Sequence, residues 1–308
     1  DVITFAIDEA YKNSNKCDRA HLFLQRVLYY IYRLNFFWFD DLENYSNEDS
    51  VILFSIRKRI EKEWCEWESN NIEPDSIDFL DYKEALNKRF DEDLNPLPCK
   101  ESLFLKDEIL VAGYKRLLAI TSLDGLVEAS QLSRVLGGVG NEIQLMLAKI
   151  FWEEYGCGKL SHKHSSYFID MLKECDMETE PEAYFALVPW EVLANINNSF
   201  LLSERKQNYL RYVGGLLYVE VSAPSSFKNY QKAGERIGLS AASTGYWSTH
   251  IKEDIRHGEW MLNKVALPLA GKYPDQAWQV VLGYDQQKFI SNRAIKSIVK
   301  SIRKLENY

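Results

Sequence analysis

The sequence has little of what secreted, membrane-spanning and nucleic-acid-binding proteins need. Its five cysteines are scattered and form no Cys-x-x-Cys pair, so neither a disulfide framework nor a thiolate zinc site is predicted. It has no run of about 18 apolar residues, which argues against a membrane-spanning helix. A net charge of −8 argues against nucleic acid as the main partner, because phosphate binding needs clustered Lys and Arg. The first residues lack the basic and apolar segments of a signal peptide. Because the cysteines indicate no disulfide framework, we expect a reducing, cytoplasmic location.

Strand patterns of convincing length are also missing, and the apolar segments have helical spacing. Ile56, Ile60, Trp64 and Trp67, for example, recur at helical intervals with charged residues between them. We predict helices over residues 20–37, 55–69, 106–121, 123–136, 141–154, 164–174, 181–195, 204–222, 227–237 and 241–267. Links that bear glycine or proline separate several of them, at 137–140, 155–158 and 222–225. The fold class is therefore all-α, a bundle whose interior can hold a cofactor.

A chain of 308 residues can form one large domain or a domain with an extension. The segment from Asn95 to Pro98 contains two prolines, which break helices and restrain the residues before them. We place a boundary there. Residues 1–98 are predicted to form an N-terminal helical extension with a dimerisation or docking role, and residues 99–308 the main domain.

Histidine is scarce, yet two of the five histidines stand in the run from His250 to His257. On an α-helix, residues i, i+4 and i+7 share one face, so His250, Asp254 and His257 project together. Nitrogen and oxygen ligands of this kind suit iron, manganese or zinc better than calcium or magnesium. Glu253, three residues after His250, is an alternative to Asp254. One helix cannot complete such a site, so other segments have to supply the remaining ligands.

A second candidate segment runs from Glu153 through a Gly-x-Gly turn to His164. A carboxylate closes one predicted helix, the glycines allow the chain to reverse, and a histidine opens the next helix. This construction can aim a carboxylate and an imidazole at one point. The residues alone leave open whether Glu153 or Glu154, and whether His162 or His164, takes that place.

Glu128 and Glu220 each interrupt an otherwise apolar stretch of a predicted helix. A single glutamate on a helix most often lies on a solvated face. A carboxylate that faces a core is costly unless it is paired or bound to a metal. Both residues are therefore candidate ligands.

Taken together, these motifs resemble the haem-oxygenase-like diiron oxidases and oxygenases, also called iron-containing redox enzymes, over roughly residues 105–270. The resemblance implies a haem-oxygenase-like seven-helix bundle and two iron ions, Fe(II) or Fe(III). It favours Glu154, His164 and Asp254 over their alternatives. The implied ligands are Glu128, Glu154, His164, Glu220, His250, Asp254 and His257, with Glu128 and Glu220 bridging the irons or completing the second one.

The same resemblance implies an O2-dependent oxidoreductase that acts through a peroxo-diferric intermediate on a small amine or amino acid. The full set of seven ligands is closer to the family members that oxygenate nitrogen in biosynthetic pathways. Alternatives are desaturation, C–C cleavage or oxidative decarboxylation of an amino acid or fatty acid at the same diiron site. A catalytically inactive helical interaction module is the alternative of another class. An external electron donor and a homodimer are candidate partners; a membrane and nucleic acid are not expected.

The substrate pocket is less clearly encoded than the ligands. Phe151, Trp152, Tyr155, Trp190 and Trp247 are candidates to line it, although packing roles are the more common use of such residues. Lys232 and Arg236 are candidate anchors for a substrate carboxylate, with a surface position as the alternative.

Overall fold

The structure is a computed structural model that describes residues 1–13, 17–34, 46–72, 81–138 and 141–307, and this part of the chain contains helices but no strand. The first helices are α1 (Val2–Ile7), α2 (Asp18–Arg33), α3 (Val51–Ser69), α4 (Tyr82–Leu94) and α5 (Lys100–Leu103). They are followed by α6 (Val111–Gly125), α7 (Ser130–Ser133), α8 (Glu142–Glu154), α9 (His164–Glu174) and α10 (Trp190–Ser203). The last four are α11 (Tyr209–Arg236), α12 (Gly245–Trp260), α13 (Leu267–Lys272) and α14 (Trp278–Glu306). The predicted all-α fold class is confirmed.

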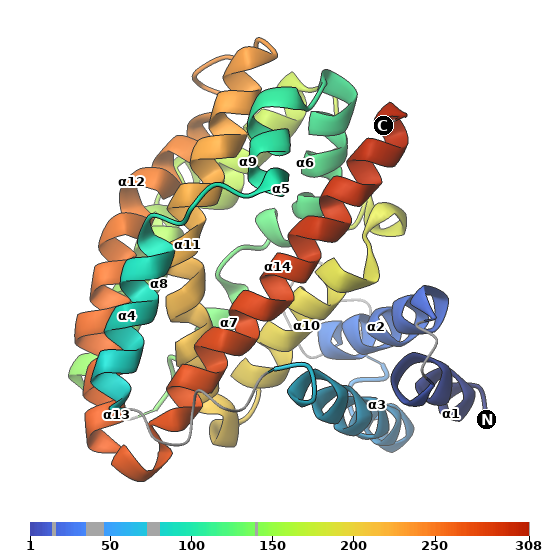
Figure 1. Ribbon diagram of the computed structural model, residues 1–308, viewed down its shortest axis with the longest axis vertical. Helices are drawn as coiled ribbons and strands as arrows, with labels where there is room; N and C mark the ends of the chain where they lie inside the picture. Colours follow the sequence, from blue (N-terminus) through green and yellow to red (C-terminus); the bar gives the residue numbers. More distant parts are fainter. Residues whose placement is uncertain (14–16, 35–45, 73–80, 139–140, 308) are drawn as a thin grey trace.

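Helix α11 is the centre of the bundle, with extensive packing against α12 on one side and α14 on the other. Helix α10 packs against α14 and α2, and α6 also contacts α14. In Figure 1, α4, α8, α11 and α12 lie on one side of the molecule, and α1, α2 and α3 gather on the opposite side, below α10 and α14. The long helices therefore enclose an interior between α11, α12, α6 and α10.

Two glycines allow α11 and α14 to cross at close range. A Cβ atom on Gly214 would lie 1.9 Å from the carbonyl oxygen of Val280, and one on Gly283 would lie 2.0 Å from the carbonyl oxygen of Arg211. Real Cβ atoms do not approach backbone this closely, so a larger residue at either position would push the helices apart. The crossing fixes the position of α11, which carries Glu220.

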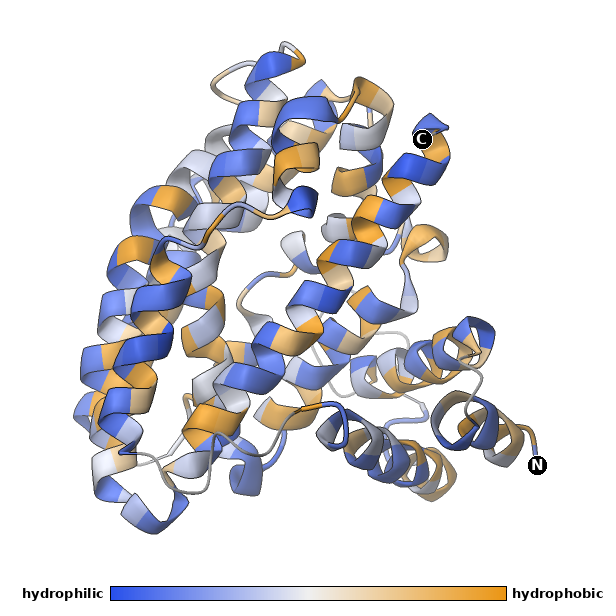
Figure 2. Cartoon of the chain, viewed as in Figure 1, coloured by the Kyte–Doolittle hydropathy of each residue, from blue (hydrophilic) through white to orange (hydrophobic). Residues whose placement is uncertain are grey.

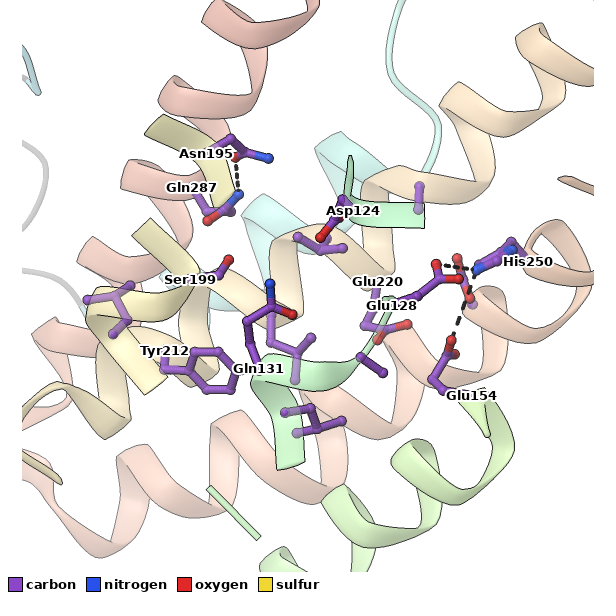
Figure 3. Close-up of a pocket in the computed structure, with 18 of the residues that line it drawn as sticks. Asp124, Glu128, Gln131, Glu154, Asn195, Ser199, Tyr212, Glu220, His250 and Gln287 are labelled. Atoms are coloured by element: carbon purple, nitrogen blue, oxygen red, sulfur yellow. Dashed lines mark hydrogen bonds and ion pairs between the residues drawn. The ribbon is translucent and has the colours of Figure 1, made fainter. Parts of the chain in front are cut away.

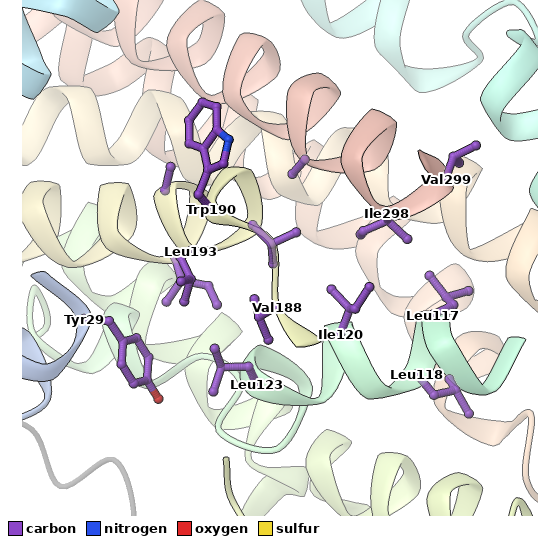
Figure 4. Close-up of a cluster of buried hydrophobic side chains, with 14 of the residues drawn as sticks. Tyr29, Leu117, Leu118, Ile120, Leu123, Val188, Trp190, Leu193, Ile298 and Val299 are labelled. Atoms are coloured by element: carbon purple, nitrogen blue, oxygen red, sulfur yellow. The ribbon is translucent and has the colours of Figure 1, made fainter. Parts of the chain in front are cut away.

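The hydrophobic core extends along the whole bundle. One part, shown in Figure 4, joins α2, α6, α10 and α14 through Tyr29, Leu117, Leu193 and Ile298, all of them buried. A second part joins α4, α8, α11 and α14. In Figure 2, the face of α4 that is turned to the viewer is mostly hydrophilic, as expected for a peripheral helix whose other face is buried.

Several predicted helix boundaries were wrong. The helices predicted over 204–222 and 227–237 form one helix, α11, which continues through Pro224. The helix predicted over 123–136 is reduced to the short α7, because Ala129 has a positive φ of 62° that ends helical geometry there. The helix predicted over 181–195 begins only at Trp190. Helices α4 and α14 had not been predicted, and residues 35–37 and 139–140 of the predicted elements lie outside the described residues.

The N-terminal region contacts the bundle at two separate places. Helix α2 packs against α10, whereas α4 packs against α11 and α14. The division near Pro98 stays a prediction, and these contacts show that helices from its N-terminal side take part in both halves of the core. Within the described residues, no helix is both long and apolar enough to cross a membrane.

Candidate metal centre

The seven predicted ligands come from five segments of the bundle. Glu128 lies in the turn after α6, Glu154 ends α8, His164 begins α9 and Glu220 lies in the middle of α11. The other three, on α12, are His250, Asp254 and His257. All of them are buried except Glu128, which is partly exposed. The structure thus brings into one interior region residues that are up to 129 positions apart in the sequence.

The turn between α8 and α9 places Glu154 next to His164. Gly156 has a positive φ of 64°, and a Cβ atom there would lie 2.4 Å from the backbone of His162 and Lys163. Only glycine allows this approach of backbone to backbone. As a result, the Oε2 atom of Glu154 lies 2.7 Å from Nδ1 of His164.

Four of the residues form a first group of converging ligand atoms, namely Glu128, Glu154, His164 and His250. His250 Nε2 lies 2.8 Å from Glu128 Oε1 and 3.0 Å from His164 Nδ1. In Figure 3, dashed lines join His250 to both Glu128 and Glu154. Nitrogen and oxygen ligands around one ion are typically about 3 Å from one another, so this spacing fits a single metal ion.

A second group consists of Glu154, Asp254 and His257. His257 Nδ1 lies 3.3 Å from Glu154 Oε1, 3.4 Å from Glu220 Oε2 and 3.8 Å from Asp254 Oδ1. Glu154 belongs to both groups, with Oε2 facing the first and Oε1 facing the second. Glu154 thus lies between the two groups, and Glu220 lies at the second group. That Glu128 and Glu220 bridge the irons or complete the second one stays a prediction.

Each of the three histidines uses its other ring nitrogen for a hydrogen bond outside the two groups. His164 Nε2 lies 3.1 Å from Glu253, His257 Nε2 lies 2.9 Å from Glu153, and His250 Nδ1 donates to the carbonyl of Tyr246 at 2.8 Å. Such bonds fix the orientation and tautomer of a metal-binding imidazole. The sequence had offered Glu153 and Glu253 as alternative ligands. In the structure they lie at the outer ring nitrogens of His257 and His164.

The remaining alternative, His162, is exposed and takes part in neither group. It ends a short 3-10 turn from Leu160 to His162 that precedes α9. His164, by contrast, is buried with both ring nitrogens facing carboxylates. The geometry therefore favours His164 over His162.

Unsatisfied atoms test whether these residues fit a metal. Glu128 Oε2, Asp254 Oδ1 and His257 Nδ1 are buried without a hydrogen-bond partner among the described residues. A buried polar atom without a partner is costly. All three belong to predicted ligands, and their mixed nitrogen and oxygen donors are of the type that binds iron. The residues present fit a metal centre.

The pKa values of these residues also fit a site for a cation. Burial by itself lowers the pKa of His164, but the neighbouring carboxylates of Glu154 and Glu253 outweigh it and raise the pKa to about 11. Burial likewise opposes the rise of the His257 pKa to about 12, which is caused by Glu154 and Glu220. Burial raises the pKa of Asp254 well above its ordinary value, and Glu220 adds to this. Without a metal, protonated imidazoles balance the carboxylates, so a bound cation has to displace those protons.

A cavity of about 190 Å³ adjoins the ligands, between the turn after α6 and helices α10 and α11. Figure 3 shows the candidate ligands at one end and Gln131, Ser199 and Tyr212 toward the other. None of the five aromatic residues proposed from the sequence lines this cavity, and neither does Lys232 or Arg236. Arg236 donates to backbone carbonyls, one of them that of Ile109.

Sequence reasoning missed most of the cavity wall, including Asp124, Gln131, Ser199 and Tyr212. Asp124 precedes Glu128 by four residues, and this interval could have signalled a shared face. The other wall residues have no comparable pattern, because they meet only through the packing of α7, α10 and α11.

Comparison with known proteins agrees with the site. Residues 115–286 match a family model described as iron-containing redox enzyme, and this segment contains all seven predicted ligands. A nitrosourea synthase from Streptomyces achromogenes subsp. streptozoticus is 29% identical over 157 residues, which cover 49% of this chain and 32% of that protein. The match therefore spans about a third of the relative's length. Since the family model covers more than half of the chain, this protein belongs to the iron-containing redox enzymes and is an oxidoreductase.

Proposed function

We propose that the chain is a non-haem diiron, O2-dependent oxygenase that transfers oxygen to a nitrogen atom of a small amine or amino acid. The observation that carries the diiron part is the position of Glu154, whose two carboxylate oxygens face two different groups of ligand atoms. The first ion would be held by Glu128, Glu154, His164 and His250, and the second by Glu154, Glu220, Asp254 and His257. Two ferrous ions bound in this way supply the electrons and the open positions for O2 activation.

The protein's own residues hold this centre in place. The hydrogen bonds from the outer nitrogens of the histidines to Glu153, Glu253 and the Tyr246 carbonyl keep the imidazole rings oriented. Pro224 has no N–H, so the carbonyl of Glu220 lacks the usual helical hydrogen bond four residues on.

Glu128 differs from the other candidate ligands in its surroundings. It lies in a turn rather than in a helix, its side chain is 20% exposed, and the hydroxyl of Tyr246 donates to its Oε1 atom at 2.9 Å. Glu128 would be the ligand of the first ion that is held from a turn, and the Tyr246 hydroxyl donates to the same oxygen that faces His250.

The nitrogen chemistry is supported by the relative, which is described as a nitrosourea synthase. Oxygenation of an amine nitrogen to a hydroxylamine places one atom of O2 in a new N–O bond. The other atom leaves as water, with two electrons and two protons from an external donor. This balance accounts for the electron donor expected as a partner.

Iron titration and isotope labelling test the two parts of the proposal separately. Anaerobic addition of Fe(II) is expected to give about two bound ions per chain, the number of ligand groups. A screen of small amines and amino acids under 18O2 is then expected to yield a product with labelled oxygen on nitrogen. Binding of fewer than two ions would contradict the diiron centre. Two ions together with a desaturated, cleaved or decarboxylated product would leave the centre in place and overturn N-oxygenation.

A further inference from the structure

The cavity beside the metal centre has an unusual distribution of charge. Its charged lining residues are Asp124, Glu128, Glu154, Glu220 and Asp254, together with His250. No lysine or arginine is among the residues that line it. The cavity wall therefore offers an anionic substrate group neither a lysine nor an arginine as a partner.

Iron would neutralise most of this charge but not all of it. Four of the five carboxylates are candidate ligands, and their charges equal those of two Fe(II) ions in magnitude. Asp124 is not among the converging ligand atoms of either group. It is the carboxylate of the cavity wall that stays uncompensated when the centre is loaded.

The charge of Asp124 is not compensated by an ion pair with a lysine, arginine or histidine of the described residues either. None of the ion pairs in the described part of the chain involves Asp124. Asp124 is exposed by solvent accessibility and lines the cavity, so its carboxylate is open to a ligand there.

Further polar groups without partners surround the same part of the cavity. Tyr212 is only 6% exposed, and its hydroxyl has no hydrogen bond to the described residues. Ser199 also lines the cavity, and its hydroxyl is likewise unpaired there. Figure 3 shows the Tyr212 ring directed toward Gln131, on the side of the cavity away from His250. In contrast, Asn195 and Gln287 are already paired with each other at 2.7 Å.

We propose that Asp124, with the hydroxyls of Tyr212 and Ser199, binds a protonated nitrogen group of the substrate in the part of the cavity that is not lined by the candidate ligands. An ammonium group donates several charge-assisted hydrogen bonds and would satisfy the carboxylate and both hydroxyls. This inference rests on the proposed function and deepens it by assigning a substrate class.

The chemistry of oxygenation adds one requirement. A protonated amine has no free electron pair, so the nitrogen that forms the N–O bond cannot be the one bound to Asp124. The substrate therefore carries two nitrogen groups, one that anchors it and one that reacts. Diamines and related polyamines fit this description, whereas fatty acids do not.

Binding to the anaerobic Fe(II)-loaded protein, measured by calorimetry, tests the inference without any turnover. The probes are n-pentylammonium, pentan-1-ol and pentanoate, which share one chain and differ in charge. We expect n-pentylammonium to bind most tightly, and Asp124→Asn to weaken its binding about 10- to 100-fold while the binding of pentan-1-ol stays unchanged. Tyr212→Phe and Ser199→Ala should each cost only a few-fold. Asp170→Asn, at an exposed position of α9, is the matched control and should have no effect.

The amount of bound iron, measured in the same samples, separates this inference from the proposed function. Unchanged n-pentylammonium binding in an iron-loaded Asp124→Asn protein would overturn the cation site and leave the diiron proposal standing. Tighter binding of pentanoate than of n-pentylammonium would do the same. Failure of the unsubstituted protein to bind iron would instead contradict the proposed function. If Asp124→Asn does not fold, Asp124→Ser provides the same comparison.

Discussion

Two clusters of charged side chains are buried in this molecule, and they are neutralised in different ways. The arginine–glutamate cluster joins α3 to the ends of α10 and to α14, and it consists of Arg57, Glu61, Glu68, Glu204, Arg205 and Arg293. The histidine–carboxylate cluster consists of the seven predicted ligands between α8, α9, α11 and α12. Both bring carboxylates from distant parts of the chain into the interior.

In the arginine–glutamate cluster, every carboxylate faces a permanent cation. The Arg57 guanidinium lies 2.7 Å from Glu204, that of Arg205 lies 3.0 Å from Glu61, and that of Arg293 lies 3.1 Å from Glu68. Arginine keeps its proton under all conditions in which proteins are folded. Each carboxylate of this cluster is thus paired with a guanidinium, and the cluster attaches α3 to the bundle.

In the histidine–carboxylate cluster, no lysine or arginine of the described residues pairs with any of the seven predicted ligands. The positive charge there belongs to imidazoles, which release their protons when a metal binds. Neutralisation by a group that can be displaced is what distinguishes a buried site for a cation from a buried structural ion pair. Four predictions test or sharpen this difference.

The largest effect is expected from Glu154→Ala, because this residue belongs to both groups of ligand atoms. Bound iron should fall close to zero per chain, and O2 consumption should fall by more than about 100-fold. Glu220→Ala should instead retain one ion. Colorimetric iron determination after gel filtration measures both. Glu259→Ala, at an exposed position of α12, is the control and should bind iron as the unsubstituted protein does. Equal iron loss in both cluster variants would show that Glu154 is not shared.

The second prediction concerns the arginine–glutamate cluster. Arg293→Met leaves Glu68, which is 1% exposed, without its cation and should lower the free energy of unfolding by about 3–5 kcal/mol. Urea unfolding of the metal-free protein measures this. Bound iron should stay the same, because the two clusters share no residue. The double variant Arg293→Met/Glu68→Gln should recover most of the loss. Reduced iron binding in Arg293→Met would mean that the clusters are not independent.

The helical periodicity of the sequence was enough to predict the all-α fold and to align His250, Asp254 and His257. Residues i, i+4 and i+7 lie on one face wherever α12 is placed in the bundle. The turn from Glu154 to His164 was also predictable, since Gly156 is needed for a close backbone approach. Local rules therefore determine which side chains each segment presents.

Relations between segments could not be predicted in this way. Pro224 and its neighbours indicated a link, yet the packing of α11 between α12 and α14 keeps the helix continuous. The position of Glu154 between two ligand groups and the place of Asp124 in the cavity wall depend on how four or more helices meet. The ligand roles themselves stay predictions, with geometry now in their favour.

The third prediction distinguishes the two halves of the histidine–carboxylate cluster. Glu253→Gln weakens the hydrogen bond that orients the His164 ring, and Glu153→Gln weakens the hydrogen bond that orients the His257 ring. Each change should lower the affinity for one of the two irons by about 10- to 100-fold and leave the other nearly unchanged. Stepwise Fe(II) titration followed by Mössbauer spectroscopy resolves the two sites. A uniform loss at both sites in either variant would argue against separate support for the two histidines.

The smallest change in stability is expected from Asp254→Asn, and its sign separates the two clusters. Burial raises the pKa of Asp254 well above its ordinary value, and its Oδ1 atom has no hydrogen-bond partner among the described residues. A neutral side chain of the same shape removes the cost of the buried charge, so the metal-free protein should keep its stability or gain about 1 kcal/mol. Iron binding at the second group should be lost. Urea unfolding of the metal-free variant is the measurement. If Asp254→Asn destabilised the protein as Arg293→Met does, the histidine–carboxylate cluster would be structural in its own right. A gain in stability together with a loss of iron would mean that the buried Asp254 carboxylate lowers the stability of the metal-free protein and serves only to bind the metal.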